Sequence, residues 1–273
     1  MLKNTDKANR IFWNEICGTV WAKELGIGNL TKESLHKFDS AFFYFYPYLL
    51  DCVKIDRMEG KKVLEVGLGY GSLGQKIAER AAYYVGLDIA ENPVQLMSYR
   101  LKRSLLAGEA VVGSVLNSPF PSEIFDIVVS VGCFHHTGDV QGCIDETFRV
   151  LKPGGVAFIM VYNQYSYRQW LRWPIRTLSV FLHEKGLLKR RSGVSEELRA
   201  SYDIDSKGEA APETVFLTIC QLRTLFTKYR EVSFRKENFR SARIERLFLL
   251  NKSNMLLRLG KIWGADIYIT ARK

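Results

Sequence analysis

The residues best suited to chemistry surround a run of alternating glycines. The stretch Val63-Leu64-Glu65-Val66 is apolar with one embedded acid, and Gly67, Gly69 and Gly71 follow it. Glycine lets the backbone turn sharply and approach a ligand closely, because no Cβ stands in the way. A helix expected from Gly71 onward would present free backbone N–H groups to a molecule bound there. The stretch therefore predicts a cradle for a cofactor.

The glycines alone leave two cofactors open. Residues Gly69 to Gly74 have the spacing G-x-G-x-x-G of dinucleotide-binding proteins, and Asp88 follows at about the distance of a ribose-binding acid. This interpretation predicts an NAD(P)-dependent oxidoreductase. The same residues also read as E-x-G-x-G-x-G beginning at Glu65, and that pattern favours a different cofactor. Later stretches of the chain must decide between them.

Two histidines and a tyrosine are the catalytic candidates. His135 and His136 follow an apolar run at 125–131, and histidine titrates in the range that general acid–base chemistry needs. Capping or packing of the next helix is the alternative for both. Tyr162 ends another apolar run and is expected to line the same edge, while Asp203 is a remoter candidate.

Strands and helices alternate around these residues. Strands are predicted at 62–67, 83–88, 109–113, 125–131 and 155–162, and helices at 71–82, 92–107 and 140–151. This alternation predicts a parallel sheet with right-handed crossovers, which gathers the carboxyl ends of the strands at one edge. Toward the end of the chain we expect a helix at 215–229, a sixth strand at 231–235 and a final strand at 265–271.

The order of motifs supports one family. The chain contains V-L-E-V-G-x-G-x-G, G-L-D, P-F-P with F-D-I-V-V-S, F-H-H-T and E-x-x-R-V-L-K-P-G-G, all between residues 61 and 163. This set resembles the core of the class I S-adenosylmethionine (SAM)-dependent methyltransferases. It is most similar to the small-molecule branch that includes the ubiquinone and menaquinone methyltransferases. The resemblance implies a Rossmann-like α/β fold with a doubly wound seven-stranded sheet of order 3-2-1-4-5-7-6, in which strand 7 is antiparallel.

The resemblance also implies the cofactor, S-adenosyl-L-methionine, and the residues that bind it. The cofactor-binding residues would be Glu65, Gly67, Gly69, Tyr70, Gly71, Asp88, Ile89, Ser114, Val115 and Ser130. Asp88 would hold the ribose hydroxyls, Ile89 and Ser114-Val115 the adenine, and Ser130 the methionine end. The family often has Asp where this chain has Ser114, so one acceptor for the adenine amino group is weakened. A non-catalytic binding protein with the same fold therefore stays open.

Two segments flank this core. Residues 1–60 are predicted to form an N-terminal helical cap, with helices near 10–17 and 38–50 and a break at Pro47. Within the SAM-binding domain, 61–273, residues 164–212 are predicted to be a lid or substrate insertion. Its apolar residues Leu171, Ile175, Leu178 and Leu182 recur at helical spacing beside Arg168, Arg172 and Arg176. Packing in the core is the usual explanation of such a stripe, and an interfacial helix is the other.

Composition limits the class of protein and its partners. The chain has 273 residues and a net charge of +10. Residues 1–163 contain 17 Lys/Arg against 18 Asp/Glu, and residues 164–273 contain 22 against 11, so the excess lies in the second half. A basic surface of this kind fits an anionic acceptor or peripheral contact with a membrane. Five scattered cysteines and the absence of a visible secretory signal or spanning segment predict a reduced cytoplasmic protein without a metal site.

These observations predict a SAM-dependent methyltransferase that acts on a small or amphipathic acceptor, anionic or lipid-linked, most simply at oxygen. Nucleic acid ranks lower as an acceptor, because no RNA-binding module and no N-P-P-Y motif is found. The oxidoreductase and the non-catalytic binding protein are the alternative functions.

Overall fold

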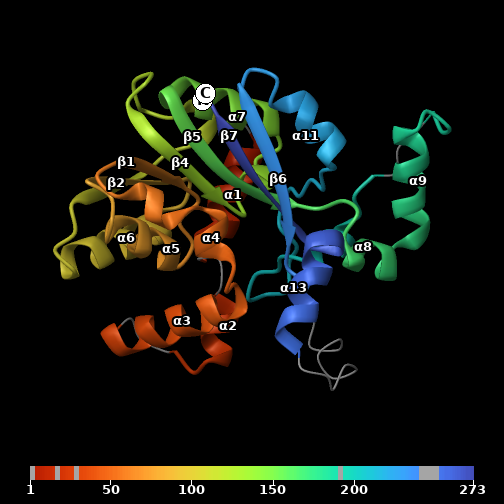
Figure 1. The fold of residues 1–273 in the computed structure, drawn as a ribbon. Helices are drawn as coiled ribbons and strands as arrows, with labels where there is room; N and C mark the ends of the chain where they lie inside the picture. Colours follow the sequence, from red (N-terminus) through yellow and green to blue (C-terminus); the bar gives the residue numbers. More distant parts are fainter. Residues whose placement is uncertain (1–3, 16–18, 28–30, 190–192, 240–251) are drawn as a thin grey trace.

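Seven strands form one sheet in the order β3-β2-β1-β4-β5-β7-β6 (Figure 1). The computed structural model describes residues 4–15, 19–27, 31–189, 193–239 and 252–273. The strands are β1 Lys62–Val66, β2 Tyr83–Asp88, β3 Gly108–Val112, β4 Phe125–Val131, β5 Leu151–Tyr162, β6 Glu231–Glu237 and β7 Asp266–Arg272. Strands β1 to β5 pair in parallel, and β7 pairs antiparallel with both β5 and β6. The predicted strand order and the antiparallel β7 are confirmed.

Strand β1 lies at the centre because both of its faces are apolar. Val63 packs into the apolar cluster on one face of the sheet, and Leu64 and Val66 pack into the cluster on the other. All three side chains are at most 3% exposed. Alternate residues of a strand point to opposite faces, so a continuous apolar run suits a strand that is covered on both sides.

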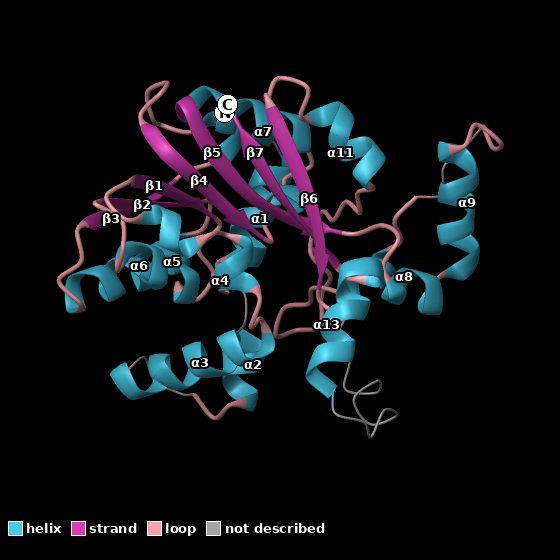
Figure 2. Cartoon of the chain, in the orientation of Figure 1, coloured by secondary structure: helices cyan, strands magenta, loops and turns pink. Residues whose placement is uncertain are grey.

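Helices cover the two faces of the sheet (Figure 2). The helices α4, α5 and α6 pack on one face, and α7 and α11 pack on the other. The helices are α1 Asn4–Trp13, α2 Thr19–Glu24, α3 Lys32–Phe45, α4 Leu49–Cys52, α5 Ser72–Ala78, α6 Glu91–Arg103, α7 Val140–Val150, α8 Tyr167–Arg172, α9 Pro174–Glu184, α10 Glu196–Ala200, α11 Ile219–Leu225 and α13 Lys252–Trp263. Short 3-10 turns occur at η1 Ile55–Met58, η2 Val115–Asn117 and η3 Phe134–His136.

Three elements differ from the sequence prediction. The helix predicted at 215–229 is shorter, because Thr218 and Gln221 form a capping box that starts α11. The residue before them, Leu217, is extended and bridges to Asn163. The strand predicted at 155–162 begins earlier, because β5 includes Pro153-Gly154-Gly155, where the pairing with β4 shifts register. The predicted helix at 10–17 ends at Trp13, and residues 16–18 lie outside the described residues.

The segment before the sheet packs against the glycine run. The ring of Phe38 on α3 stacks on the ring of Tyr70, with centroids 4.0 Å apart and planes 15° apart. Asp39 on the same helix pairs with Arg100 of α6 at 2.8 Å and accepts a hydrogen bond from the Ser72 hydroxyl at 2.5 Å. Helix α3 is therefore fixed to the helices α5 and α6. It ends before Pro47, as expected from the restricted backbone of proline.

The apolar stripe of the insertion faces solvent, so the interpretation as core packing is wrong. Helices α8 and α9 project from the edge of the sheet (Figure 1). Ile175 is 85% exposed, Leu171 73% and Leu178 47%. The side of α9 that packs inward carries Thr177 and Val180 instead. Within the described ranges, no helix has the length and apolar character that crossing a bilayer requires.

Candidate functional site

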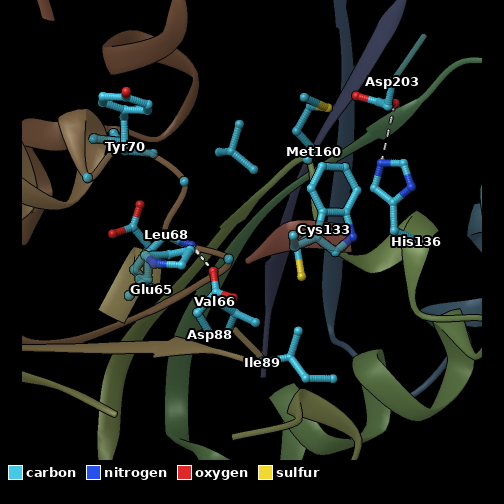
Figure 3. Close-up of a pocket in the computed structure, with 18 of the residues that line it drawn as sticks. Glu65, Val66, Leu68, Tyr70, Asp88, Ile89, Cys133, His136, Met160 and Asp203 are labelled. Carbon is cyan, nitrogen blue, oxygen red and sulfur yellow. Dashed lines mark hydrogen bonds and ion pairs between the residues drawn. The ribbon is translucent and has the colours of Figure 1, made fainter. Parts of the chain in front are cut away.

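A cavity of about 370 Å³ opens at the carboxyl ends of the parallel strands. Its wall includes residues 65–73 after β1, 87–89 after β2, 113–115 after β3 and 131–133 after β4. Volumes of about 300–1,000 Å³ are typical of sites for small molecules. Figure 3 shows Glu65, Asp88 and Tyr70 on one side of this space, with His136 and Asp203 across from them.

The glycines are required by the backbone conformation and by close packing. Gly67, Gly69 and Gly71 all have positive φ, at 83°, 49° and 72°. A Cβ at Gly67 would stand 2.7 Å from the Cβ of Cys133, which is closer than real side chains approach. Side chains other than glycine rarely adopt such backbone angles. The loop therefore brings bare backbone to the edge of the cavity, as the sequence predicted.

Asp88 organises the loop from the end of β2. Its Oδ2 accepts a hydrogen bond from the backbone N–H of Leu68 at 2.8 Å, and its Oδ1 accepts one from Ala90 at 2.9 Å. Burial raises the pKa of this carboxyl to about 6, while the backbone N–H groups oppose that rise. The carboxylate is thus charged at neutral pH, and each oxygen keeps a lone pair for a hydroxyl in the cavity.

Glu65 is buried on the face of the sheet that carries α5. Its Oε2 accepts a hydrogen bond from the Tyr84 hydroxyl at 2.5 Å. Burial raises the pKa of Glu65 to about 8, although the Tyr84 hydrogen bond lowers it. A Cβ on Gly74 of α5 would stand 2.4 Å from this oxygen, so the helix approaches β1 closely only because residue 74 is glycine. Gly74 serves the packing of α5 against the sheet.

The other predicted cofactor residues divide into two groups. Tyr70, Ile89, Ser114 and Val115 line the cavity. Ser130 does not, which corrects the prediction that it lines the methionine end. Its side chain is fully buried and its hydroxyl donates to the Val66 carbonyl at 3.1 Å, tying β4 to β1. Strand alternation explains the difference, since the neighbouring Val131 faces the cavity.

His136, Tyr162 and Asp203 meet on the opposite wall. The Nδ1 of His136 lies 2.8 Å from the Glu213 carbonyl, which can only accept, so Nδ1 carries the proton. The Nε2 atom then faces Asp203 Oδ2 at 3.6 Å (Figure 3). The Tyr162 hydroxyl donates to the same carboxylate at 3.0 Å. Asp203, the remoter candidate of the sequence, thus becomes the partner of both.

His135 is removed from the catalytic candidates. Its side chain is fully buried and does not line the cavity, and neither ring nitrogen has a hydrogen-bond partner. Burial holds the pKa of this imidazole well below its usual range. The ring instead packs on Tyr162, with centroids 4.0 Å apart. Adjacent residues of a turn point in different directions, and here only His136 reaches the cavity.

Sequence reasoning missed several residues of the wall. Asp6, Asn9 and Trp13 come from one face of α1, and their spacing of i, i+3 and i+7 was the available signal. Arg168 and Asp266 also line the cavity, and burial raises the pKa of Asp266 to about 7. No local pattern singled out Asp266, and Arg168 was noted only as part of the row of arginines beside the apolar stripe.

Tyr44 at the end of α3 and Tyr46 just after it differ in where they lie, and so do the arginines of the insertion. Tyr46 lines the cavity, whereas Tyr44 is 71% exposed and does not. The guanidinium of Arg176 donates to the Gly193 carbonyl at 2.9 Å and lies 3.2 Å from the side-chain oxygens of Gln164 and Gln169. Arg176 therefore supports the insertion and is not a free anion-binding group.

The fold and the site together define a class of protein. A doubly wound sheet of this order has its ligand site beyond the carboxyl ends of the strands, where the glycine loop, Glu65 and Asp88 stand. Residues 64–159 match the family described as "Methyltransferase domain". The chain therefore contains a methyltransferase domain, and SAM-dependent methyltransferases of this fold use S-adenosylmethionine as their cofactor. The bare glycine backbone and the volume of the cavity fit that cofactor.

The relatives agree with this class. The chain is 29% identical over 136 residues to a demethylmenaquinone methyltransferase of Tropheryma whipplei, covering 47% of this chain and 55% of that protein. It is 32% identical over 109 residues to a ubiquinone biosynthesis O-methyltransferase of Pseudomonas fluorescens, covering 39% and 47%. The chain thus spans about half the length of these curated relatives.

A solved structure shares the fold. The crystal structure of a SAM-dependent methyltransferase from Methanosarcina mazei superposes with a TM-score of 0.55 at 19% identity, over 81% of this chain and 96% of that one.

Proposed function

We propose that this protein transfers a methyl group from SAM to an oxygen of a small, amphipathic acceptor. The observation that carries the proposal is the pair of His136 and Asp203, which faces the same cavity as the glycine loop and Asp88. S-adenosylmethionine supplies an already activated methyl group, so the protein must position the acceptor, exclude water and remove the acceptor's proton.

The side chains divide this work. His136 is the general base: the Glu213 carbonyl fixes the proton on Nδ1, which leaves Nε2 able to take the proton of an acceptor hydroxyl. Asp203 then faces the imidazolium that forms and stabilises its charge. Tyr162 holds the Asp203 carboxylate in place through its hydroxyl. The ring of Trp13, with its centroid 4.9 Å from that of His136, shields the base from water.

The lining of the cavity favours a flat, apolar acceptor. Aromatic side chains from separate parts of the chain contribute to its wall: Trp13, Trp21, Phe42, Tyr46, Tyr202 and Tyr268. Rings of this kind stack on planar ligands. Since the relatives act in quinone biosynthesis by name, we propose a prenylated phenol or quinol as the class of acceptor.

A transfer assay tests the proposal. Purified protein is given SAM with a radiolabelled methyl group and one of two probes, a short-chain prenylated catechol or a short-chain demethylmenaquinol. We expect the label to pass to the catechol as a methyl ether. If the label passes only to a ring carbon of the quinol, the reaction is C-methylation and the proposal of O-methylation is wrong. Binding of NADH without any binding of SAM would overturn the proposal and support the oxidoreductase.

We further propose that the protein is cytoplasmic and reaches such an acceptor at a membrane surface. The exposed stripe of α8 and α9 supports this, because Arg172 and Lys185 are exposed beside the apolar residues Leu171 and Ile175. An apolar stripe flanked by cations is the pattern of helices that lie on anionic lipid surfaces. The occupant we infer for this face is an anionic bilayer.

Replacing both Leu171 and Ile175 by glutamate is expected to weaken binding to phosphatidylglycerol vesicles by about tenfold or more, because each buried aliphatic side chain contributes about 1.5–3 kcal/mol. Co-sedimentation with vesicles measures this. The matched control is Leu105→Glu, since Leu105 is 93% exposed but stands after α6, away from the insertion. Equal vesicle binding by the double variant and the wild type would contradict a membrane role for α8 and α9.

A further inference from the structure

Helix α1 lies across the cavity between the loop after β4 and the start of α6. Near its beginning, Thr5 approaches Gly138, where a Cβ on the glycine would lie 3.3 Å from Thr5 Cγ2. Just beyond its end, the Asn14 side-chain oxygen accepts hydrogen bonds from the backbone N–H groups of Glu91 and Asn92 at 3.1 and 3.0 Å. These contacts at both ends fix which face of the helix looks into the cavity.

Two polar side chains on that face carry acceptor oxygens. Asn9 is 4% exposed, and its Nδ2 donates to the His136 carbonyl at 2.7 Å. That bond fixes the orientation of the amide and leaves Oδ1 buried with no hydrogen-bond partner. Asp6 is 5% exposed and lines the cavity. Asn9 thus holds a buried acceptor oxygen without a donor, and Asp6 brings a carboxylate to the same cavity.

A buried acceptor without a donor points to a ligand that donates. Leaving a buried polar group unsatisfied costs about 1–3 kcal/mol, and more for a charged group. Asp6 as a carboxylate accepts only, and the free atom of Asn9 is an oxygen. The missing ligand group must therefore carry N–H or O–H donors. An amino group with two N–H bonds would donate to both side chains at once.

The position of Asp6 associates it with the β3 side of the cavity. Thr5, the residue before Asp6, meets Gly138 just ahead of α7, and a Cβ on Gly142 of that helix would lie 3.0 Å from Leu116, the residue after Val115. Burial raises the pKa of Cys143, the next residue of α7, to about 12, and the carboxylates of Asp139 and Asp6 add to the rise. Cys143 packs in the same apolar cluster as Val115, which lines the cavity after β3. The nearby Ser114 hydroxyl oxygen already accepts from the Leu116 N–H at 3.3 Å.

The groups around the cavity indicate that the adenine of the cofactor lies in the region near Ser114 and Val115. Asp88 marks the ribose, since an acid at the end of the second strand binds ribose hydroxyls in folds of this kind. The loop at Glu65 and the base His136 lie on the other sides of the cavity (Figure 3). One part of the cavity remains next to Asp88, between Ile89 and Val115 and beneath α1. An adenine ring attached to that ribose must lie there.

We propose that Asp6 and Asn9 on α1 recognise the exocyclic amino group of the cofactor's adenine, a task for which Ser114 offers no carboxylate. Adenine differs from hypoxanthine at this position, where an amino group with two donors replaces a carbonyl. The inference rests on the SAM assignment but is independent of the acceptor. It makes α1 part of the cofactor site, so cofactor binding and the docking of α1 stabilise one another.

The test compares S-adenosylhomocysteine with S-inosylhomocysteine, in which a carbonyl oxygen replaces the amino group, by calorimetric titration of the full chain. The wild type is expected to bind the inosine analogue about 100-fold more weakly, since a site built for a donor rejects an acceptor there. Asp6→Asn offers an amide N–H₂ and is expected to lose about tenfold or more for S-adenosylhomocysteine while it gains for the inosine analogue.

Control variants distinguish a failure of the proposed role of Asp6 from a failure of the cofactor assignment. Lys7→Gln changes the exposed face of the same helix and should leave both affinities unchanged. Asp6→Ala removes the carboxylate without adding a donor and should bind the two ligands with similar affinity.

If the wild type binds neither ligand, the cofactor assignment fails. If the wild type binds S-adenosylhomocysteine and all variants keep its preference, Asp6 has no role in recognition and this proposal alone is wrong. A purely structural role would weaken both ligands equally and lower the melting temperature.

Discussion

Asp88→Ala is expected to weaken the binding of S-adenosylhomocysteine by about 100-fold or more. Two charge-assisted hydrogen bonds to ribose hydroxyls would be lost, each worth about 1.5–3 kcal/mol. The backbone N–H groups of Leu68 and Ala90 would also lose their acceptor, so the glycine loop would no longer be held. Calorimetric titration of S-adenosylhomocysteine measures the change directly and needs no acceptor substrate.

A second acid offers a matched control for Asp88. Asp126 at the start of β4 also accepts a hydrogen bond from backbone, the Lys62 N–H at 2.8 Å, but it does not line the cavity. Asp126→Ala should therefore lower stability without changing cofactor affinity. Asp88→Asn keeps the shape but turns an amide N–H₂ toward one of the two backbone donors, so it should also bind poorly. Wild-type affinity in both Asp88 variants would remove this residue from the cofactor site.

His136→Ala is expected to lower kcat for a hydroxyl acceptor by about 10²–10⁴-fold, the usual contribution of a positioned general base. Asp203→Asn should give a smaller loss, because the imidazolium would still form but without a facing carboxylate. Affinity for S-adenosylhomocysteine should stay unchanged in both variants, since neither side chain is assigned to the cofactor.

The neighbouring imidazole is the control for this second prediction. His135→Phe replaces a ring that is fully buried, has no hydrogen-bond partner and lies outside the cavity wall. It should keep kcat within about tenfold of the wild type, the cost expected of a packing change beside Tyr162. A loss in His135→Phe equal to that in His136→Ala would show that the turn acts through its packing and that His136 is not the base.

Local signals in the sequence determined the class of the protein and the centre of its site. Val63 to Val66 is apolar on both faces, so β1 had to be a central strand, and the glycines after it could only be a tight, bare backbone turn. Asp88 was identified because the end of a parallel strand fixes where its side chain emerges. The alternation of elements predicted a parallel sheet with right-handed crossovers, and the resemblance to the SAM-dependent methyltransferases implied its strand order.

The tertiary structure decided which side chains share the cavity. Ser130 and His135 lie within one residue of cavity-lining positions, but strand alternation and a 3-10 turn direct them inward. The apolar stripe of α8 and α9 has helical spacing, yet spacing cannot say whether protein or solvent covers it, and here it is solvent. Asp6, Asn9 and Asp203 reach the site from segments far away in the chain. Their positions depend on how α1 and the insertion pack. That packing results from many weak contacts between residues distant in the sequence, so no short sequence pattern predicts it.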